Sequence, residues 1–339
     1  MPKLSRNILP NISIIVVNHN GRHLLEKCFA SLMKTTYPNI EIIMVDNASK
    51  DDSVNFVSNT FPSVMIQRSV TNLGYAGGCN KGAGIAKGDY VVFMNNDIEV
   101  SRGWIKPLIK ACLRPDVAIC GGKMLFSEKK DHLYSAGGVL NPFSIPIDRG
   151  LSELDKGQFD RKKDVAYVSG AALMVDKKTF EMLGGFDADY FAYCEEVDLC
   201  LRAWLSGFRV VFVPSSIVYH EFGGSFGKPS PIRRFFGIRN MAFTLIKVLS
   251  LKSLILLLPA FLTFRLFEGL ILAVISRGGY LLSFKSAIAS VLSDFRCVLN
   301  KRSRIQENRS VNDKIILRFF LNVRWITLLF KRNILRTVL

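Results

Sequence analysis

Four short stretches rich in Ile and Val, alternating with stretches of helical periodicity, constrain the fold of this chain more than any other feature. The apolar stretches cover residues 12–17, 40–45, 64–68 and 90–94. Helical periodicity covers about 22–36, 51–60 and 75–87. Three of the four apolar stretches are almost continuously hydrophobic, which is typical of parallel strands buried on both faces. The alternation predicts β-α-β units and an α/β fold built on a Rossmann-like sheet.

Polar residues follow three of these strands at the point where each strand ends. The polar clusters cover residues 18–21, 46–49 and 95–97. Ligands of such sheets bind beyond the carboxyl ends of the strands, so we expect the three clusters to form one rim. The candidate substrate-binding side chains on this rim are Asn18, Asn20, Asp46, Asn47 and Asn96.

Asp46 is the first acidic residue of this rim, and two roles remain open for it. Its carboxylate can accept a hydrogen bond from the imide N–H of uracil or thymine, or from a ribose hydroxyl. Alternatively, Asp46 and Ser49 cap the helix that follows. The spacing alone does not favour either role.

A glycine-rich loop spans residues 72–82 and leads into a predicted helix. With Asn72, Gly74 and Gly78, this loop can admit a diphosphate to backbone N–H groups. The loop matches neither the GxGxxG fingerprint nor the P-loop pattern, so it does not support a dinucleotide or ATP site. For the glycines by themselves, a tight turn beside a closely packed helix is the favoured alternative.

Asp97 and His220 are the candidate metal ligands. Asp97 ends the polar cluster 95–97, and His220 follows a second apolar stretch. A divalent cation that bridges diphosphate oxygens needs only one or two protein ligands, and imidazole suits Mn²⁺ better than Mg²⁺. The alternatives are an Asx turn at Asp97 and an ordinary surface or core histidine at His220.

Three carboxylates, Glu195, Glu196 and Asp198, stand at the start of a predicted helix over 195–205 that Gly207 ends. Acidic residues in a first turn often only complement the helix dipole. An aromatic-rich segment, 186–193, precedes them, and burial among aromatic side chains raises the pKa of a carboxyl group. A carboxylate of this kind can act as a general base.

The rest of the first two thirds of the chain has weaker patterns. Residues 123–165 are rich in Gly, Pro and charge, which predicts a loop or hairpin excursion over the rim. Two separate strands are expected over 208–213 and 216–220. Seven scattered cysteines without a CxxC pair indicate a reducing compartment, and the short apolar stretch near the N-terminus does not resemble a signal peptide.

Charge divides the chain into two parts at residue 227. Residues 1–227 carry 25 basic and 24 acidic side chains, whereas residues 228–339 carry 20 and 4, so nearly all of the net charge of +17 lies in the last third. We therefore predict a catalytic domain over 1–227 and a basic, apolar helical region over 228–339. A region that is both basic and apolar favours an anionic membrane over nucleic acid as its partner.

Residues 249–276 form the most apolar stretch, but their charge-free runs, 253–264 and 269–276, are shorter than the ~20 residues that span a bilayer. A single crossing would also export a strongly basic tail, against the positive-inside rule. We expect helices that lie in or dip into the cytoplasmic face, as a hairpin broken near Pro259 or Gly278–Gly279, with an interfacial helix over 315–330. The alternative is a helical subdomain packed on the catalytic domain.

Six segments occur together in the order and spacing of one known family: SIIVVNHNG, VDNASKDDS, NLGYAGGCNKG, GDYVVFMNND, GGFDADYFAYCEEVDLCLRAWLSGF and VYHEFGGS. The chain resembles the inverting family 2 glycosyltransferases, especially their rhamnosyltransferase-like branch, over about residues 11–247. The resemblance implies a GT-A fold and a nucleotide-diphosphate sugar donor, a dTDP- or UDP-sugar such as dTDP-rhamnose. It also implies Mg²⁺ or Mn²⁺ and a hydroxyl acceptor on a lipid-linked or cell-surface glycan.

The resemblance also assigns roles to single residues. It implies that Asp46 contacts the nucleobase, that Asp97 and His220 bind the metal, and that Glu196 is the catalytic base. Glu195 stays open as the base, because the family usually has Asp where this chain has Glu196. The metal-binding motif is Asn95-Asn96-Asp97 here, which leaves one carboxylate. Asp198 and Arg239 complete the substrate-binding residues.

Two other functions compete with this one. A nucleotidyltransferase on a similar sheet would need a basic pyrophosphate-binding loop near the N-terminus, and residues 18–21 contain no Lys or Arg before Arg22. A nucleic-acid-binding protein would carry its charge on a groove-facing surface of a folded module. Here the charge is interleaved with Leu and Ile, so we expect no nucleic-acid partner.

Overall fold

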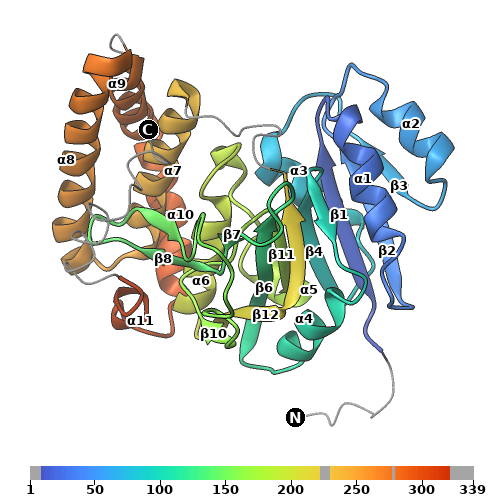
Figure 1. Cartoon of the computed structure of the whole chain (residues 1–339). Helices are drawn as coiled ribbons and strands as arrows, with labels where there is room; N and C mark the ends of the chain where they lie inside the picture. The colour runs from blue at the N-terminus through green and yellow to red at the C-terminus, as the bar shows by residue number, and fades with distance from the viewer. Residues whose placement is uncertain (1–8, 222–229, 277–278, 321–339) are drawn as a thin grey trace.

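A ten-stranded mixed sheet forms the centre of the molecule (Figure 1). The computed structural model describes residues 9–221, 230–276 and 279–320. Four mutually parallel strands make up one half of the sheet, in the order β4-β1-β2-β3. They are β1 (Ile12–Asn18), β2 (Ile40–Asp46), β3 (Met65–Arg68) and β4 (Tyr90–Asn95). The strands predicted from the sequence are therefore confirmed.

The register of the parallel strands brings their polar ends to one edge. Asn18 at the end of β1 pairs with Asp46 at the end of β2, and Val17 pairs with Asn95 at the end of β4. Because these pairs are in register, the polar residues after the three strands begin at the same level of the sheet. The predicted rim is confirmed.

The other half of the sheet is mixed. In it, β11 (Ala172–Asp176) runs antiparallel to both β4 and β6 (Val117–Phe126), and β12 (Arg209–His220) runs parallel to β6. The strands β5 (Ile98–Val100), β7 (Leu133–Ser135) and β10 (Lys163–Asp164) pair with β12, β6 and β12. A separate hairpin consists of β8 (Gly138–Leu140) and β9 (Pro146–Asp148). The hairpin expected within 123–165 is confirmed.

Helices cover both faces of the sheet because alternate side chains of each strand point to opposite faces. On β1, Ile14 and Val16 belong to one hydrophobic core, whereas Ile15 and Val17 belong to the other. The first core includes residues of α1 (Arg22–Leu32), α2 (Ser53–Thr60) and α4 (Ile105–Cys112). The second includes residues of α3 (Gly74–Ile85), α5 (Lys177–Met182) and α6 (Glu195–Leu205).

The prediction of two strands over 208–220 is wrong. A single strand, β12, covers this stretch, and its pairing with β6 shifts register between Val213 and Ile217. Pro214 lies at this irregularity, where a residue without an N–H is tolerated. The strand resumes on the same partner after the shift, so the break in the sequence pattern is a bulge and not an end.

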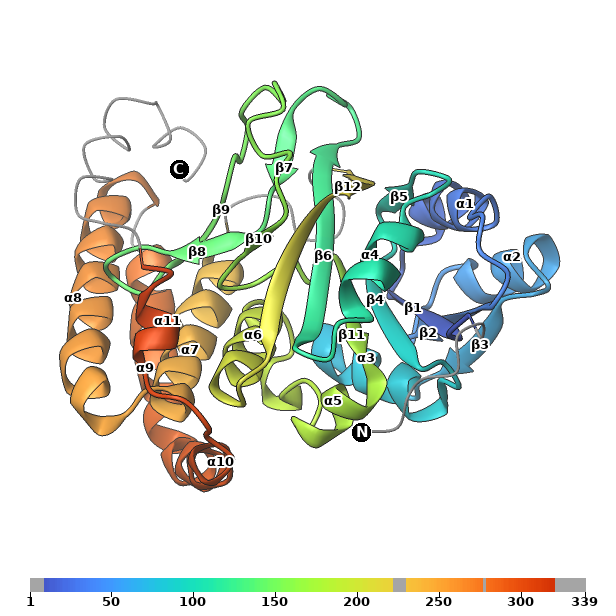
Figure 2. The ribbon, with the colours of Figure 1, turned by 90° about the horizontal axis from the view of Figure 1, so that it is seen from below.

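Within the described residues after Ser230, five helices stand together on the side of the molecule away from β3 and α2 (Figures 1 and 2). They are α7 (Pro231–Val248), α8 (Leu251–Ser276), α9 (Gly279–Ser293), α10 (Phe295–Glu307) and α11 (Lys314–Leu317). Helix α7 packs against α6, α8, α9 and α10, and α11 packs against α6. The alternative of helices packed on the catalytic domain therefore describes α7, α10 and α11.

Helix α8 runs without interruption through Pro259, so the expected break there is wrong. The carbonyl that loses its partner lies on a helix face left exposed, because Pro259 itself is exposed. Among the described residues, Leu251–Ala273 is one helical stretch long and apolar enough to cross a membrane, and little of it is buried. The possible break at Gly278, and residues 321–330 of the expected interfacial helix, lie outside the described residues.

Candidate active site

Hydrogen bonds join the polar rim into one unit. The amide of Asn96 donates to Asn18 Oδ1 at 2.8 Å, and the amide of Asn18 donates to Ser49 Oγ at 3.2 Å. Asn20 has a left-handed backbone (φ 52°), and its side-chain oxygen accepts from the N–H of Lys50 at 2.7 Å. The backbone N–H of Asn20 also donates to Ser49 Oγ, at 3.0 Å. The structure thus brings together three of the five rim residues predicted from the sequence, directly or through Ser49.

Asp46 is buried, and its Oδ1 atom has no hydrogen-bond partner within the described part of the chain. A buried carboxylate oxygen without a partner destabilises the folded state unless a ligand supplies a hydrogen-bond donor. Nothing in its contacts indicates a helix cap: the residue that precedes α2 is Asp52, and the first N–H of that helix, of Ser53, donates to Asp51 Oδ1 at 3.2 Å. The geometry favours the ligand-binding role of Asp46 over the capping role.

Asn47 fastens the glycine-rich loop to the end of β2. Its amide donates to the carbonyl of Gly74 at 2.7 Å, and its oxygen accepts from the N–H of Leu73 at 3.2 Å. Asn72 contributes a local turn, because its side-chain oxygen accepts from the N–H of Gly74 at 2.9 Å. Asn47 and Asn72 therefore shape the loop through contacts within the chain.

Close packing explains the two glycines singled out in the loop. Gly74 has φ +69°, and a Cβ there would lie 2.3 Å from the carbonyl oxygen of Phe191. A Cβ on Gly78 would lie 2.8 Å from Val17. The N–H of Tyr75 at the start of α3 already donates to Phe191 at 2.6 Å. The favoured alternative, a tight turn beside a closely packed helix, fits these contacts.

Asp97 and His220 meet at the rim although they are far apart in the chain. His220 Nε2 lies 3.1 Å from Asp97 Oδ1, because β5 pairs with β12 and sets Ile98 opposite His220. Both side chains are buried, and His220 Nδ1 has no hydrogen-bond partner in the described chain. The edge of the Tyr134 ring contacts the imidazole, with 4.4 Å between ring centroids.

These two side chains fit a divalent cation that is shared with a substrate. One carboxylate and one imidazole are the hard and borderline donors that Mn²⁺ accepts. No group of three His, Cys, Asp or Glu side chains suited to a metal occurs among the described residues. The remaining ligands would therefore be water and diphosphate oxygens, as expected for an ion held mainly by its substrate.

Glu195 and Glu196 are the first two residues of α6, which packs on the opposite face of the sheet from α1. Glu196 is half-buried beside Gly170. A Cβ added at Gly170 would lie 3.2 Å from the Cβ of Glu196. Burial raises the pKa of Glu196 to about 7, and the nearby carboxylate of Asp148 contributes to that rise. Burial also raises the pKa of Glu195 well above its ordinary value, and Glu195 Oε2 has no hydrogen-bond partner among the described residues.

A carboxyl group with a pKa near 7 is suited to accept a proton at neutral pH. Glu196 has this pKa and is also the more exposed of the two residues. Glu195 is more deeply buried, and burial together with repulsion from Glu196 raises its pKa well above the ordinary value. These properties favour Glu196 as the general base.

Asp148 in β9 is a site residue that sequence reasoning missed. Ser135 Oγ donates to Asp148 Oδ1 at 2.7 Å. Burial raises the pKa of Asp148 to about 6, while Ser135, His220 and Arg233 oppose that rise. Asp148 thus lies within electrostatic range of both the Asp97–His220 pair and Glu196. No signal in the irregular stretch 123–165 distinguished it from other acidic residues there.

Asp198 lies in a different environment from the one its predicted role suggests. It is fully buried, and both of its oxygens are engaged: Lys247 Nζ lies 2.7 Å from Oδ1, and Arg202 Nε donates to Oδ2 at 2.7 Å. Although burial raises the pKa of Asp198, Arg202 and Lys247 outweigh burial and lower it. The contacts of Asp198 are therefore with cations of this chain.

Arg239 in α7 is also occupied within the chain. Its guanidinium donates to the carbonyl of Asp189 and lies over the rings of Phe235, Phe236 and Phe243, at 5.2–5.6 Å from their centroids. Burial lowers its pKa. The structure therefore places Arg239 beside the segment that precedes α6 and not on the polar rim.

Residues 187–194 form a loop that leads directly into Glu195 and Glu196, the base loop. Phe191, Tyr193 and Cys194 have left-handed backbones with φ of 60°, 71° and 64°. Such conformations cost on the order of 1–3 kcal/mol each for residues other than glycine. They persist only where surrounding contacts hold them, and they often occur at functional sites.

Comparisons with known proteins identify the family of this chain. The family model described as "Glycosyl transferase family 2" matches residues 13–184, just over half of the chain. The N-acetylglucosaminyl-diphospho-decaprenol L-rhamnosyltransferase of Mycobacterium tuberculosis is 29% identical over 245 residues, which cover 66% of this chain and 78% of that protein. The family match includes Asp46 and Asp97 but ends before the base loop.

Solved structures share the fold. GalNAc-T7, determined with UDP, GalNAc and Mn²⁺, superposes with a TM-score of 0.59 at 17% identity. The match covers 72% of this chain and 48% of that one, so this chain spans about half of GalNAc-T7. Residues 1–349 of TarS from S. aureus, with UDP, give a TM-score of 0.56 at 18% identity and cover 88% of both chains. The chain therefore belongs to glycosyl transferase family 2 and is a glycosyltransferase with the GT-A fold.

Proposed function

We propose that this glycosyltransferase moves a sugar from a nucleotide-diphosphate donor to a hydroxyl group, with inversion at the anomeric carbon. The observation that carries the proposal is Glu196, a half-buried carboxyl at the start of α6 whose pKa is raised to about 7. Donors of this class are supported by GalNAc-T7 and TarS, which were determined with UDP. A dTDP- or UDP-sugar, including dTDP-rhamnose, is the donor we propose.

The reaction follows from the chemistry of the two ends of the site. Glu196 removes the proton from the acceptor hydroxyl, and the oxygen attacks the anomeric carbon from the face opposite the diphosphate. The bond between that carbon and the diphosphate oxygen breaks, and the nucleoside diphosphate leaves with its electron pair. Attack from the opposite face inverts the configuration.

The donor is held on the polar rim in this proposal. Asp46 contacts the nucleobase, and Asn18, Asn20 and Asn96 line the path of the diphosphate, with Asp97 and His220 at its end. Asp97 and His220 would hold a divalent cation there, which would supply positive charge to the departing diphosphate. The buried, unpaired oxygen of Asp46 and the Asp97–His220 contact support this placement.

We propose a lipid-linked or cell-surface glycan as the acceptor. The Mycobacterium tuberculosis relative is named for a decaprenol-linked substrate, and its match covers 66% of this chain. Helix α8 supports the same class, because large apolar side chains recur on its solvent-facing side at helical spacing. These side chains are Ile255, Leu256, Leu266, Phe267, Leu270 and Ile271, each at least 37% exposed.

The charged residues of α8 point to its membrane orientation. Glu268 contacts Arg265 Nη1 at 2.8 Å and Arg234 Nη1 of α7 at 3.0 Å. Arg265 and Glu268 are therefore paired toward α7, whereas Lys252, the third charged residue of α8, is exposed near the start of the helix. The exposed residues of α8 after Lys252 carry no charge, so this face is free to enter a lipid surface. We propose that residues 228–339 hold the catalytic domain, 1–227, against the cytoplasmic face of a membrane, with α8 lying in the interface.

The reaction is tested by incubating the protein and a polyprenyl-diphosphate-linked sugar with a panel of UDP-, dTDP- and GDP-sugars while nucleotide release is measured. We expect one donor class to be consumed with an acceptor-dependent rate. Release of nucleotide from none of them would contradict the proposal.

The base is tested with Glu196→Gln. We expect turnover to fall by at least ~10²-fold, because the amide cannot accept the proton, while nucleotide binding stays within about twofold. Glu195→Gln and the exposed Glu26→Gln of α1 are the comparison variants. Loss of turnover in Glu195→Gln, together with an active Glu196→Gln, would instead assign the base to Glu195.

A further inference from the structure

The base loop is held from one side by a single buried amide on α7. Asn240 is fully buried, and its Nδ2 lies within hydrogen-bond distance of three carbonyl oxygens of the loop. It donates to Tyr190 at 3.0 Å, to Ala192 at 2.8 Å and to Tyr193 at 2.7 Å. Two amide hydrogens are therefore shared among three carbonyls, all within the four residues that precede Cys194.

These carbonyls belong to the strained part of the loop. Each carbonyl lies in the peptide group directly before a residue with positive φ, namely Phe191, Tyr193 or Cys194. Backbones with positive φ are uncommon for residues other than glycine. In the sequence, no Gly or Asn occupies these three positions, although those residues adopt this conformation most easily. The conformation therefore depends on contacts from outside the loop, and Asn240 supplies three of them.

The opposite side of the loop contacts the glycine-rich segment. The carbonyl of Phe191 accepts from Tyr75 N at 2.6 Å, at the start of α3. The Tyr75 hydroxyl in turn donates to the carbonyl of Gly170 at 2.5 Å, and Gly170 lies against Glu196. The base loop is thus fixed between α3 and α7, with Glu196 at its exit.

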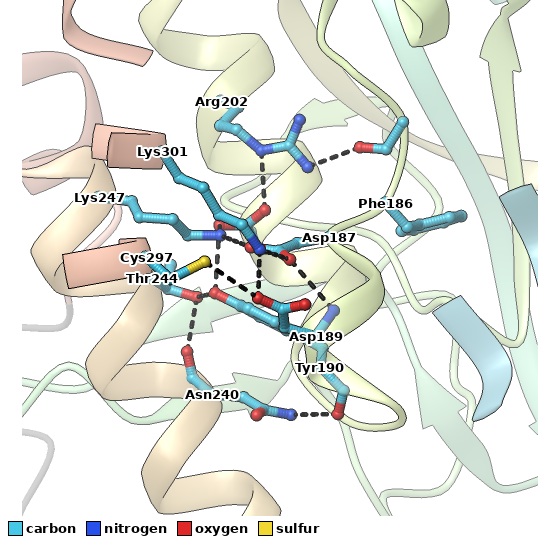
Figure 3. Close-up of polar contacts among 12 residues, drawn as sticks. Phe186, Asp187, Asp189, Tyr190, Arg202, Asn240, Thr244, Lys247, Cys297 and Lys301 are labelled. Carbon is cyan, nitrogen blue, oxygen red and sulfur yellow. Dashed lines mark hydrogen bonds and ion pairs between the residues drawn. The ribbon is translucent and has the colours of Figure 1, made fainter. Parts of the chain in front are cut away.

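A buried ion-pair cluster fastens the start of the loop to the same C-terminal helices (Figure 3). Lys247 of α7 lies 2.6 Å from Asp187 Oδ2 and 2.7 Å from Asp198 Oδ1 of α6. Lys301 of α10 lies 2.5 Å from Asp187 Oδ1. Because Asp187 begins the loop and Asp198 lies on the helix after it, this cluster secures both ends of the segment that Asn240 holds in the middle.

We propose that Asn240 is a positioning residue for the reaction: by holding the base loop in its left-handed conformation, it sets the direction in which Glu196 meets the acceptor hydroxyl. This inference rests on the proposed role of Glu196 as the base. It follows that α7 belongs to the catalytic apparatus, and that the C-terminal third does more than bind a membrane. Truncation before α7 would remove activity even toward a water-soluble acceptor.

The test uses the full chain with Asn240→Ala, which removes the three hydrogen bonds without adding charge. Asn300→Ala on the exposed side of α10 is the matched control. We expect Asn240→Ala to lower kcat by about a hundredfold, the usual cost of misplacing a reacting group by ~1 Å. UDP and dTDP affinities, measured by calorimetry, should stay within about twofold, because the rim does not include the loop. Asn300→Ala should behave as the unmodified protein.

A second readout separates positioning from general loss of structure. Glu196 must be ionised to act, so activity falls as the pH drops through its pKa of about 7. In Asn240→Ala the loosened loop admits water to Glu196, and the acid limb of the kcat profile should move to lower pH. A role limited to stability would lower the folded fraction and leave the position of the limb unchanged.

The outcomes distinguish this inference from the proposed function. If Glu196→Gln is inactive and Asn240→Ala has unchanged kcat and an unchanged acid limb, the positioning role is wrong and the base assignment stands. If Glu196→Gln is active, the base assignment itself is wrong. Should Asn240→Ala fail to give folded protein, Asn240→Leu keeps the branching at Cγ without a donor and is subject to the same two measurements.

Discussion

At the scale of single residues, the buried polar atoms without partners mark the places where a ligand is expected. Asp46 Oδ1 and His220 Nδ1 are such atoms within the described part of the chain, and both belong to residues that the sequence pattern indicates. Asn47 and Asn72, which the same pattern indicates, have their polar atoms engaged by the backbone of the glycine-rich loop. Residue type and strand position therefore identify the rim. The hydrogen bonds then separate side chains that are available to a ligand from those that hold the glycine-rich loop in shape.

Asp97 leads to a prediction at this scale. It is one of two candidate ligands in this part of the site, so Asp97→Ala leaves His220 alone at the cation. We expect the affinity for UDP or dTDP measured with Mn²⁺ to fall about tenfold or more, which corresponds to ~1.4 kcal/mol per tenfold. Affinity without Mn²⁺ should not fall and should rise slightly, since Asp97 repels the diphosphate when no cation lies between them and the variant lacks that repulsion.

The exposed Asp52→Ala, just before α2, is the control, because it removes the same side chain away from the His220 contact. Titration calorimetry with and without Mn²⁺ measures both affinities. A dependence on Mn²⁺ that survives in Asp97→Ala would assign the cation to other residues.

At the scale of elements, the C-terminal helices differ in what they bury. Helix α7 is polar at Asn240, Thr244 and Lys247, and each of these buried side chains contacts the base loop or α6. Helix α8 presents an apolar face to solvent, and its Glu268 forms an ion pair with Arg234 of α7. The overall charge and hydropathy of residues 228–339 describe both helices alike, whereas the packing assigns them different roles.

Phe267 on the exposed face of α8 gives the prediction at this scale. It is 61% exposed, and Phe267→Glu places a carboxylate where we expect anionic lipid. Partitioning onto phosphatidylglycerol vesicles should weaken about tenfold, because both apolar contact and electrostatic attraction are lost. Turnover of a water-soluble acceptor should be unchanged, since Phe267 lies on the face of α8 turned away from the catalytic domain.

Met182→Glu on α5 introduces the same charge at a side chain that is 56% exposed, and it should leave vesicle binding intact. Sedimentation with vesicles measures the partition of each variant. Equal partitioning of Phe267→Glu and the unmodified protein would remove α8 from the membrane contact.

At the scale of the whole molecule, activity and stability should have different pH optima. Lys247 and Lys301 outweigh burial and lower the pKa of Asp187 to about 2, so the stability it contributes is complete above its unfolded pKa near 4 and lost as the pH falls to about 2. Glu196 and Asp148 have the opposite sign. Burial raises their pKa values to about 7 and 6, so the folded state binds protons more tightly and gains stability as the pH falls from 7 toward 4.

We therefore expect the melting temperature to be highest between about pH 4 and 6, while turnover falls below pH 7 because Glu196 becomes protonated. Differential scanning calorimetry and initial rates over about pH 3–9 measure the two curves. The Glu196→Gln variant should lose part of the rise in melting temperature between about pH 7 and 5. A melting temperature that rises steadily to about pH 8 would contradict the assigned pKa directions.

The sequence by itself determined the four parallel strands of the sheet, the rim and the family. Continuous apolar stretches and their polar ends are local features, and parallel pairing brings such ends to one edge whatever the rest of the chain does. Asn18, Asp46 and Asn96 could therefore be assigned to that edge from the residue pattern alone. The six motifs added Glu196 and His220 because their order along the chain is characteristic.

Tertiary structure alone decided the contacts between distant segments. Asn240 donates to the carbonyl of Ala192, 48 positions away in the chain, and Asp198 forms an ion pair with Lys247. Asp148 belongs to a stretch without periodicity, yet it lies within electrostatic range of His220. Local sequence patterns do not predict such contacts, because the packing of whole elements determines which side chains face each other. For the same reason α8 continues through Pro259: its contacts with α7 and α9 stabilise a helix that local propensity would interrupt.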